Sequence, residues 1–264
     1  MGVPVRSLWL VSMLASVIPL DAAPIVLSGV PAYNWYHGCG PTAAASVLGY
    51  WDLHGFPDLF EASGADLFWT WNVQDEISSP EHNAKYDSTP DDPNLPEPPD
   101  TSIADFFHTS ELYLDFGWSY QSAAASALAV YAAYRGYHFL TYSDGYWNLD
   151  FQRLAAEIDA GRPMLVLVDT DGDGETDHFV PVLGYDNRGP DGLWYGLYTT
   201  WREDELVEWE PFAPIAAGQP WGIGYCTYAV PLDTPAPEPA TAGLALVPLA
   251  LWLTRRARRR GSIP

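Results

Sequence analysis

The chain has 264 residues, of which 12 are basic and 34 acidic, and its net charge is −22. This charge argues against binding to nucleic acid or to an anionic membrane surface, and it favours divalent cations and basic partners. Twelve tryptophans, sixteen tyrosines and ten phenylalanines argue against wholesale disorder, and two cysteines are too few for a disulfide scaffold.

The first 23 residues have the pattern of a secretory signal peptide. One basic residue precedes an apolar stretch from Leu8 to Leu20, and two alanines follow it. The stretch is shorter than the ~20 residues that a membrane-spanning helix needs, although an uncleaved anchor is the alternative. We therefore expect residues 1–23 to direct export and residues 24–234 to form the folded body.

Helices are predicted in the first half of this body. Residues 40–53 read GPTAAASVLGYWDL, a helical pattern with a broad apolar face and a proline in its first turn. Residues 72–100 are polar and rich in proline, so we expect a long surface loop there. Helix resumes after a Ser/Thr cap in residues 101–110 and again in the alanine-rich segment 119–137.

Strands are predicted in the second half. The expected strands cover residues 137–142, 162–170, 177–186, 193–200 and 222–232, with one helix at 148–161. Helices followed by strands predict an α+β fold with two lobes.

Residues 235–264 have the order of a sorting tail. Pro-Glu-Pro at 237–239 precedes an apolar run at 240–253, and five arginines follow. The run is short for a membrane span, but arginine side chains snorkel and an arginine cluster stays cytoplasmic. The order closely resembles the PEP-CTERM sorting signal of Gram-negative bacteria. That resemblance implies recognition by an exosortase, removal of the tail and release to the envelope or extracellular matrix; a single-pass anchor is the alternative.

Cys39 stands between two glycines at the start of the helix predicted for 40–53. The thiolate is the reactive form of cysteine, and the partial positive charge of a helix N-terminus lowers the pKa of a thiol. The same position offers backbone N–H groups to an oxyanion on an attacked carbonyl. These features predict a nucleophile, and a disulfide with Cys226 is the alternative in an exported protein.

A thiol nucleophile needs a base, which is a histidine held by an Asp or Asn in the best-known arrangement. The chain has six histidines. His37 is only two residues from Cys39, and neighbours on a turn usually point apart. His178 opens a predicted strand of the second half, across the interface from the helix of Cys39, and is our candidate base.

Two segments, GCGPTAAASVLGYWD and DHFVPVLGYD, together resemble the papain-like fold. The resemblance is to secreted relatives of the cysteine peptidases that process bacteriocin leaders. It covers about residues 25–231, with a poor match over 58–115, and LAAEIDAGRPMLVLVD fits the helix and strand that precede the histidine strand. It implies a helical N-terminal lobe with Cys39 as nucleophile and an antiparallel C-terminal sheet with His178 as base.

Two positions depart from the pattern of such families. The oxyanion-hole glutamine is expected about six residues before the nucleophile, where this chain has a tyrosine, and Asn34 beside it is our candidate donor. The third catalytic residue, an Asp or Asn, is expected after the histidine strand, where Thr199 or Thr200 stands; we assign Thr199. Asp204 and Asp186 are the carboxylates that would substitute. Threonine orients a neutral imidazole but cannot stabilise imidazolium as a carboxylate does.

The acidic loop DTDGDGETD leads directly into the predicted histidine strand. Asp169, Asp171 and Asp173 alternate ahead of a glycine, as at the start of an EF-hand loop. Crowded carboxylates repel one another unless a cation neutralises them, so we expect calcium, with Glu175 and Asp177 as further ligands. The loop lacks the glutamate of the twelfth position, and an acidic hairpin turn is the alternative.

These features predict an exported papain-like cysteine peptidase, ordered by calcium, that cuts a peptide or protein through a thioester at Cys39. A catalytically impaired matrix or adhesion protein on the same fold is the second reading, because the third catalytic position lacks a carboxylate. Acyl transfer or amide hydrolysis by the same Cys–His pair is the third. The further partners would be an exosortase-type enzyme and, until processing, the membrane through the C-terminal helix.

Overall fold

The computed structural model describes residues 23–66, 68–86, 94–111 and 114–235. The predicted signal peptide and sorting tail lie outside these ranges, apart from one residue each. Among the described residues, no helix has the length and apolar character to cross a membrane.

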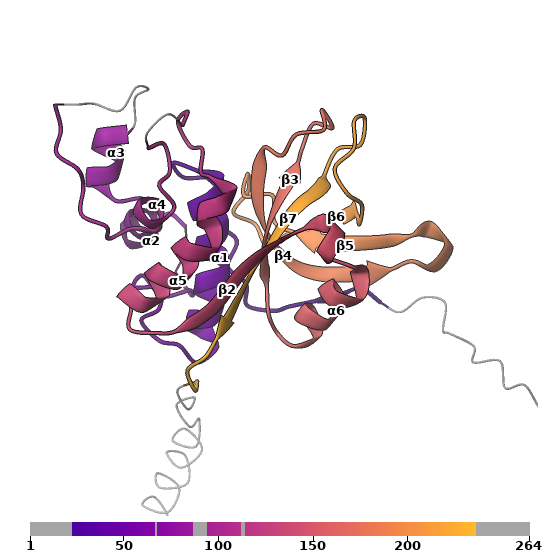
Figure 1. Ribbon diagram of the computed structural model, residues 1–264. Helices are drawn as coiled ribbons and strands as arrows, with labels where there is room; N and C mark the ends of the chain where they lie inside the picture. The colour runs from indigo at the N-terminus through magenta and orange to yellow at the C-terminus, as the bar shows by residue number, and fades with distance from the viewer. Residues whose placement is uncertain (1–22, 67, 87–93, 112–113, 236–264) are drawn as a thin grey trace, which may run out of the picture.

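Helices dominate the first half of the chain and strands the second, and Figure 1 shows the two parts side by side. The helical elements are α1 (Cys39–Leu53), α2 (Trp71–Ile77), α3 (Pro80–Tyr86), α4 (Ile103–Phe106), η1 (Gln121–Ala123), α5 (Ala124–Tyr134), η2 (Tyr146–Asn148), α6 (Phe151–Asp159) and η3 (Gly189–Asp191). The short elements labelled η are 3₁₀ turns.

Seven strands form one antiparallel sheet in the order β2–β7–β3–β4–β5–β6, and β1 pairs with β4. The strands are β1 (Ile25–Val26), β2 (Phe139–Gly145), β3 (Met164–Asp169), β4 (His178–Asn187), β5 (Leu193–Leu197), β6 (Glu208–Pro211) and β7 (Gly222–Pro231). The acidic loop therefore joins two neighbouring central strands, and His178 begins the second of them.

The central strand β3 is buried on both faces. Its residues Leu165 and Leu167 contribute to a core that also contains buried residues of α1 and α5. Met164, Val166 and Val168 contribute to a second core with α6. Successive side chains of a strand point to opposite faces, so one face of the sheet carries α1 and α5 and the other carries α6.

The predicted α+β class, with Cys39 on a helix of the first half and His178 on an antiparallel sheet, is confirmed. The arrangement is consistent with a papain-like fold. The strands β1 and β6 were not predicted, because they are short segments that owe their conformation to pairing with β4 and β5.

The predicted surface loop over 72–100 is wrong in its first part, which forms α2 and α3. Helix α2 buries Val73 and Ile77, which compensates for its polar composition. Helix α3 begins at Pro80, where proline is tolerated because the first turn has no intrahelical partner for its N–H. The described residues 94–100 contain neither helix nor strand, as the prolines there require.

Candidate active site

Cys39 is the first residue of α1. The preceding turn is fixed by Thr42, whose hydroxyl donates to the Gly38 carbonyl at 2.6 Å and accepts from the Tyr36 N–H at 3.0 Å. Pro41 fits the first turn of the helix without loss of a hydrogen bond. The Gly-Cys-Gly-Pro-Thr segment thus holds the thiol at a helix N-terminus, with only 8% of the residue exposed.

A cleft of about 450 Å³ lies beside Cys39 and is also lined by His178. Its walls come from the segment before α1, from residues 114–121 and from the facing ends of β3 and β4. The remaining lining residues are Trp35, Leu114, Phe116, Gly117, Trp118, Ser119, Tyr120, Gln121, Leu167, Thr176, Asp177 and Phe179. The fold therefore brings the predicted nucleophile and the predicted base to one cavity with aromatic walls.

Thr109 and Ser119 pack directly on the nucleophile turn. A Cβ at Gly38 would lie 2.7 Å from the Thr109 methyl group, and a Cβ at Gly40 would lie 2.8 Å from the Ser119 hydroxyl oxygen. The two glycines that flank the cysteine are thus required by close approach.

The ring of His178 is held at its edge and on one face. Its Nε2 lies 2.7 Å from the Thr199 carbonyl oxygen and 3.2 Å from the Thr200 hydroxyl oxygen. The indole of Trp201 stacks on the ring with 4.6 Å between centroids. With 6% of the residue exposed, the ring has little freedom to turn.

These contacts decide which ring nitrogen is the base. A carbonyl oxygen only accepts hydrogen bonds, so Nε2 of His178 carries a proton and donates it to Thr199. In the neutral ring the lone pair is then on Nδ1, which has no hydrogen-bond partner among the described residues. No hydrogen bond joins Cys39 to His178 in the described part of the chain; such contacts are often long in free enzymes and tighten with substrate.

Burial determines the charge state of both groups. It raises the pKa of the Cys39 thiol, and nearby backbone N–H groups, first that of Phe179, offset only part of this effect. Burial also lowers the pKa of His178, against the opposing Thr199 carbonyl and the Asp177 carboxylate. Both directions favour a neutral thiol beside a neutral imidazole. The prediction of a lowered thiol pKa is therefore wrong: the backbone N–H groups act as expected, but burial outweighs them.

Thr199 meets His178 through its main chain and not through its hydroxyl. Its side-chain oxygen instead accepts from the Trp201 N–H at 3.3 Å. Neither Asp186 nor Asp204 is hydrogen-bonded to the histidine; each pairs with an arginine two residues away. A main-chain contact of this kind leaves no signal in the sequence.

Asn34 is half-buried and does not line the cleft. Its Oδ1 accepts from the Trp35 N–H at 3.0 Å, so its role as oxyanion donor stays a prediction. The backbone N–H of Phe179 lies close enough to Cys39 to lower the pKa of the thiol. Sequence reasoning missed this donor, because β4 lies beside α1 only in the folded chain.

The alternative disulfide is wrong. Both cysteines are free and buried. Cys39 belongs to the core under α1, whereas Cys226 belongs to the core on the opposite face of the sheet, with its Sγ 3.6 Å from the Met164 sulfur. Cys226 is therefore a buried small side chain, and Cys39 keeps its thiol.

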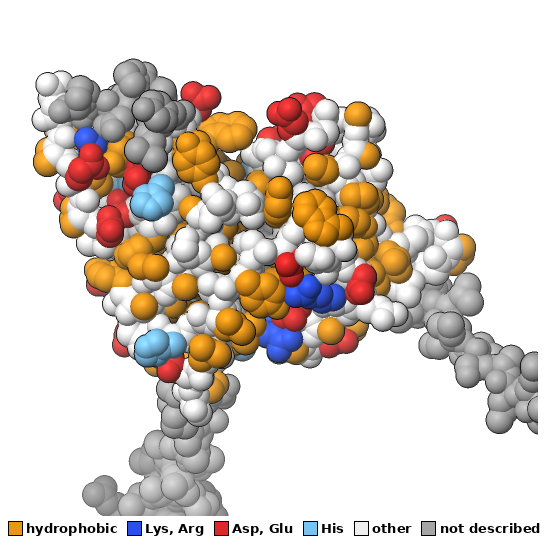
Figure 2. All heavy atoms as spheres, in the orientation of Figure 1, with side chains coloured by type: hydrophobic (Ala, Val, Ile, Leu, Met, Phe, Trp, Pro, Cys, Tyr) orange, Lys and Arg blue, Asp and Glu red, His pale blue; other side chains and the backbone are white. Residues whose placement is uncertain are grey.

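The acidic loop brings together three of its five predicted ligands. Oxygens of Asp169, Asp171 and Asp173 lie within 4.8 Å of one another and could hold a cation. Asp177 turns away, because both of its oxygens accept from Thr170 at 3.0 and 2.6 Å, and Glu175 lies outside the cluster. Figure 2 shows acidic side chains gathered at the tip of this loop.

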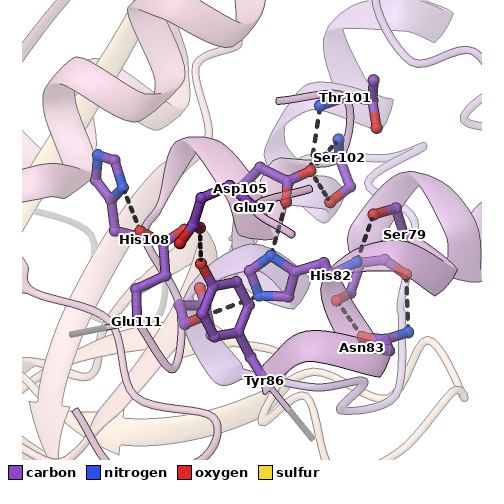
Figure 3. Close-up of polar contacts among 12 residues, drawn as sticks. Ser79, His82, Asn83, Tyr86, Glu97, Thr101, Ser102, Asp105, His108 and Glu111 are labelled. Atoms are coloured by element: carbon purple, nitrogen blue, oxygen red, sulfur yellow. Dashed lines mark hydrogen bonds and ion pairs between the residues drawn. The ribbon is translucent and has the colours of Figure 1, made fainter. Parts of the chain in front are cut away.

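A buried histidine–aspartate pair contacts Thr109, which packs on the nucleophile turn; Figure 3 shows the pair. The Nδ1 of His82 lies 2.7 Å from Asp105 Oδ1, and its Nε2 lies 2.9 Å from the Thr109 carbonyl oxygen. Both residues are at most 2% exposed. Both ring nitrogens thus lie within hydrogen-bond distance of an oxygen. Sequence reasoning missed this pair, whose members stand 23 residues apart.

The comparisons with known proteins agree with this geometry. The model of the Peptidase_C39 like family matches residues 27–198, which include Cys39, His178 and the acidic loop. No curated protein matches the chain. The chain belongs to the Peptidase_C39 like family, and this membership implies a cysteine peptidase with a peptide substrate.

Proposed function

From this membership and the shared cleft we propose that the chain is an exported cysteine peptidase with Cys39 as nucleophile and His178 as base. The observation that carries the proposal is the single cavity lined by both residues, with Nδ1 of His178 free to accept a proton. Its aromatic walls suit apolar side chains of the substrate next to the bond that is cut.

The reaction begins with a neutral pair. The Cys39 S–H proton passes to Nδ1 of His178 as the sulfur attacks the carbonyl carbon of the peptide. Backbone N–H groups at the start of α1 stabilise the oxyanion. The imidazolium returns its proton to the leaving amine as the C–N bond breaks, and water then hydrolyses the thioester to an acid and a free thiol.

Two other activities fit the same residues less well. A non-catalytic matrix or adhesion protein would not require a free thiol and a histidine of fixed tautomer to line the same cavity. Acyl transfer uses the same thioester but passes the acyl group to an amine instead of water. An added amine that diverts the product distinguishes transfer from hydrolysis.

The direct test is hydrolysis of an unbiased peptide mixture, read by mass spectrometry. We expect the wild-type protein to release peptides with free carboxyl ends and Cys39→Ala to release none above background. Cys226→Ala is the matched control and should keep the wild-type cleavage sites. Equal cleavage by the Cys39 variant would contradict the proposal.

We also propose that calcium binds the cluster of Asp169, Asp171 and Asp173. Three carboxylates this close repel one another, and hard oxygen ligands are those that calcium takes. The Asp169 oxygens accept from the N–H groups of Gly172 and Gly174 at 2.6 and 2.8 Å, which fixes the loop around them. Asp169 is the last residue of β3, and the cluster lies a few residues before His178, the first residue of β4. Bound calcium would therefore order the start of β4.

Calcium should raise the melting temperature of the purified body. At 100 times the dissociation constant, binding stabilises the folded state by about 2.7 kcal/mol, or roughly 5–10 °C for a domain of this size. The double variant Asp171→Asn, Asp173→Asn should lose this rise, and Asp191→Asn, on another loop, should keep it. A rise of the same size in the double variant would contradict the site.

Export and processing are proposed from the two end segments of the sequence. A body held outside the cytoplasm meets calcium at concentrations that suit a weak site. The mass of the mature protein recovered from outside the producing cells tests this. We expect loss of residues 1–23 and removal of the Arg-rich tail; a full-length mass would contradict both cleavages.

A further inference from the structure

Thr200 occupies an unusual place beside the histidine. It is completely buried, and its φ of +59° lies in the left-handed region. For a β-branched residue this conformation is a genuine outlier. Such strain persists only where surrounding contacts hold it.

Two contacts hold Thr200, and they connect two parts of the candidate site. Its hydroxyl oxygen lies 3.2 Å from Nε2 of His178. Its carbonyl oxygen accepts from the Trp35 N–H at 2.5 Å, and Trp35 lines the cleft four residues before Cys39. Thr200 thus connects His178, at the start of β4, to the segment that precedes Cys39.

We propose that Thr200 is a positioning residue: its hydroxyl accepts a second hydrogen bond from the Nε2–H group that the Thr199 carbonyl already fixes, and its strained backbone ties the histidine to the segment before Cys39. This inference rests on the proposed function. In the Asp- or Asn-containing arrangement a carboxylate or amide orients the histidine. Here the Thr200 hydroxyl and the Thr199 carbonyl would do so.

The arrangement has a chemical consequence. When Nδ1 takes the thiol proton, the ring becomes an imidazolium, and its Nε2–H bonds to Thr199 and Thr200 strengthen. No carboxylate touches the ring among the described residues, so the stabilisation of this charge is modest. The titratable groups that share the cleft with His178 are Cys39, Tyr120 and Asp177, and the variants below leave all three in place.

The test compares three substitutions at one position. Thr200→Val removes the hydroxyl but keeps the shape, Thr200→Asn restores a polar group in a residue that tolerates left-handed backbone, and Thr200→Asp adds a carboxylate. We expect Thr200→Val to lower kcat about 3- to 10-fold at unchanged KM, and Thr200→Asn to restore most of the activity.

The pKa of His178, followed by NMR without substrate, is the second readout. Its signal is assigned by its loss in His178→Ala. Thr200→Val should lower the pKa by a few tenths, and Thr200→Asp should raise it by about one unit or more. The control is Thr227→Val, which removes a buried hydroxyl bonded to Ser143 and should leave the His178 titration unchanged.

The two readouts separate the two proposals. Shifts of the His178 pKa without any peptide hydrolysis would support the positioning role and overturn the peptidase. Hydrolysis with wild-type kcat and an unchanged His178 pKa in Thr200→Val would overturn the positioning role and leave the peptidase intact.

Discussion

Replacing His178 by alanine should lower kcat/KM for peptide hydrolysis by about 100- to 10,000-fold, the usual contribution of a general acid–base residue. The neutral Cys39 thiol has no other group within the described cleft that is placed to take its proton, since the Asp177 oxygens are bound to Thr170. His138→Ala is the matched control, because His138 is 75% exposed and pairs with Asp233 away from the cleft. Comparable rates in the two variants would exclude His178 as the base.

The pH profile of the wild-type protein tests the same residue without a mutation. His178 must be neutral to accept the proton, and it is neutral above its pKa. Burial lowers this pKa below the ordinary value of about 6.5. The acid limb of kcat/KM should therefore lie below pH 6.5, and an acid limb above that value would contradict a buried neutral base.

Replacing Asp105 by asparagine should lower the free energy of unfolding by about 1–3 kcal/mol, the usual cost of leaving a buried polar group without its hydrogen-bond partner. The variant removes the carboxylate that lies 2.7 Å from the buried His82 ring and accepts from the N–H and the hydroxyl of Ser102. Denaturant unfolding measures the loss. Glu97→Gln is the matched control: Glu97 pairs with Lys85 but is 74% exposed, so its loss should be below about 1 kcal/mol.

The effect of Asp105 also has a defined pH dependence. Burial tends to raise the pKa of this carboxyl, but hydrogen bonds from His82 and Ser102 outweigh it and hold the pKa below its usual range. A carboxyl with a lowered pKa stabilises the folded state above its unfolded pKa of about 3.9. The difference between wild type and Asp105→Asn should persist at neutral pH and shrink as the pH falls through the lowered value. A constant difference down to pH 2 would exclude a stabilising contribution from the ionised carboxylate.

The sequence predicted those parts of the site that lie in local motifs. The glycines around Cys39, the proline and Thr42 encode the nucleophile turn within five residues, and the structure shows the contacts that need the two glycines and Thr42. His178 was predicted because a run of apolar residues follows it and forms a central strand. Short-range patterns of this kind can be interpreted because apolar residues recur with different periods in helices and in strands.

The parts that escaped prediction depend on long-range packing. Helices α2 and α3 form in polar sequence because each buries a few residues, and the buried pair of His82 and Asp105 joins α3 to α4. The direction of the Cys39 pKa depends on burial under a wall that is distant in sequence. His178 is held by the Thr199 carbonyl and by Thr200, whose backbone is strained. A pattern of side chains in the sequence indicates neither feature.

Acylation of the protein by an activated peptide ester tests the central claim most directly. After a brief reaction with a peptide p-nitrophenyl ester and acid quenching, peptide mass spectrometry locates the acyl group. We expect one acyl group per molecule, on Cys39, with Cys226 unmodified and with its formation strongly slowed in His178→Ala. Acylation elsewhere, or acylation of Cys39 at the same rate without the histidine, would contradict a Cys39–His178 peptidase.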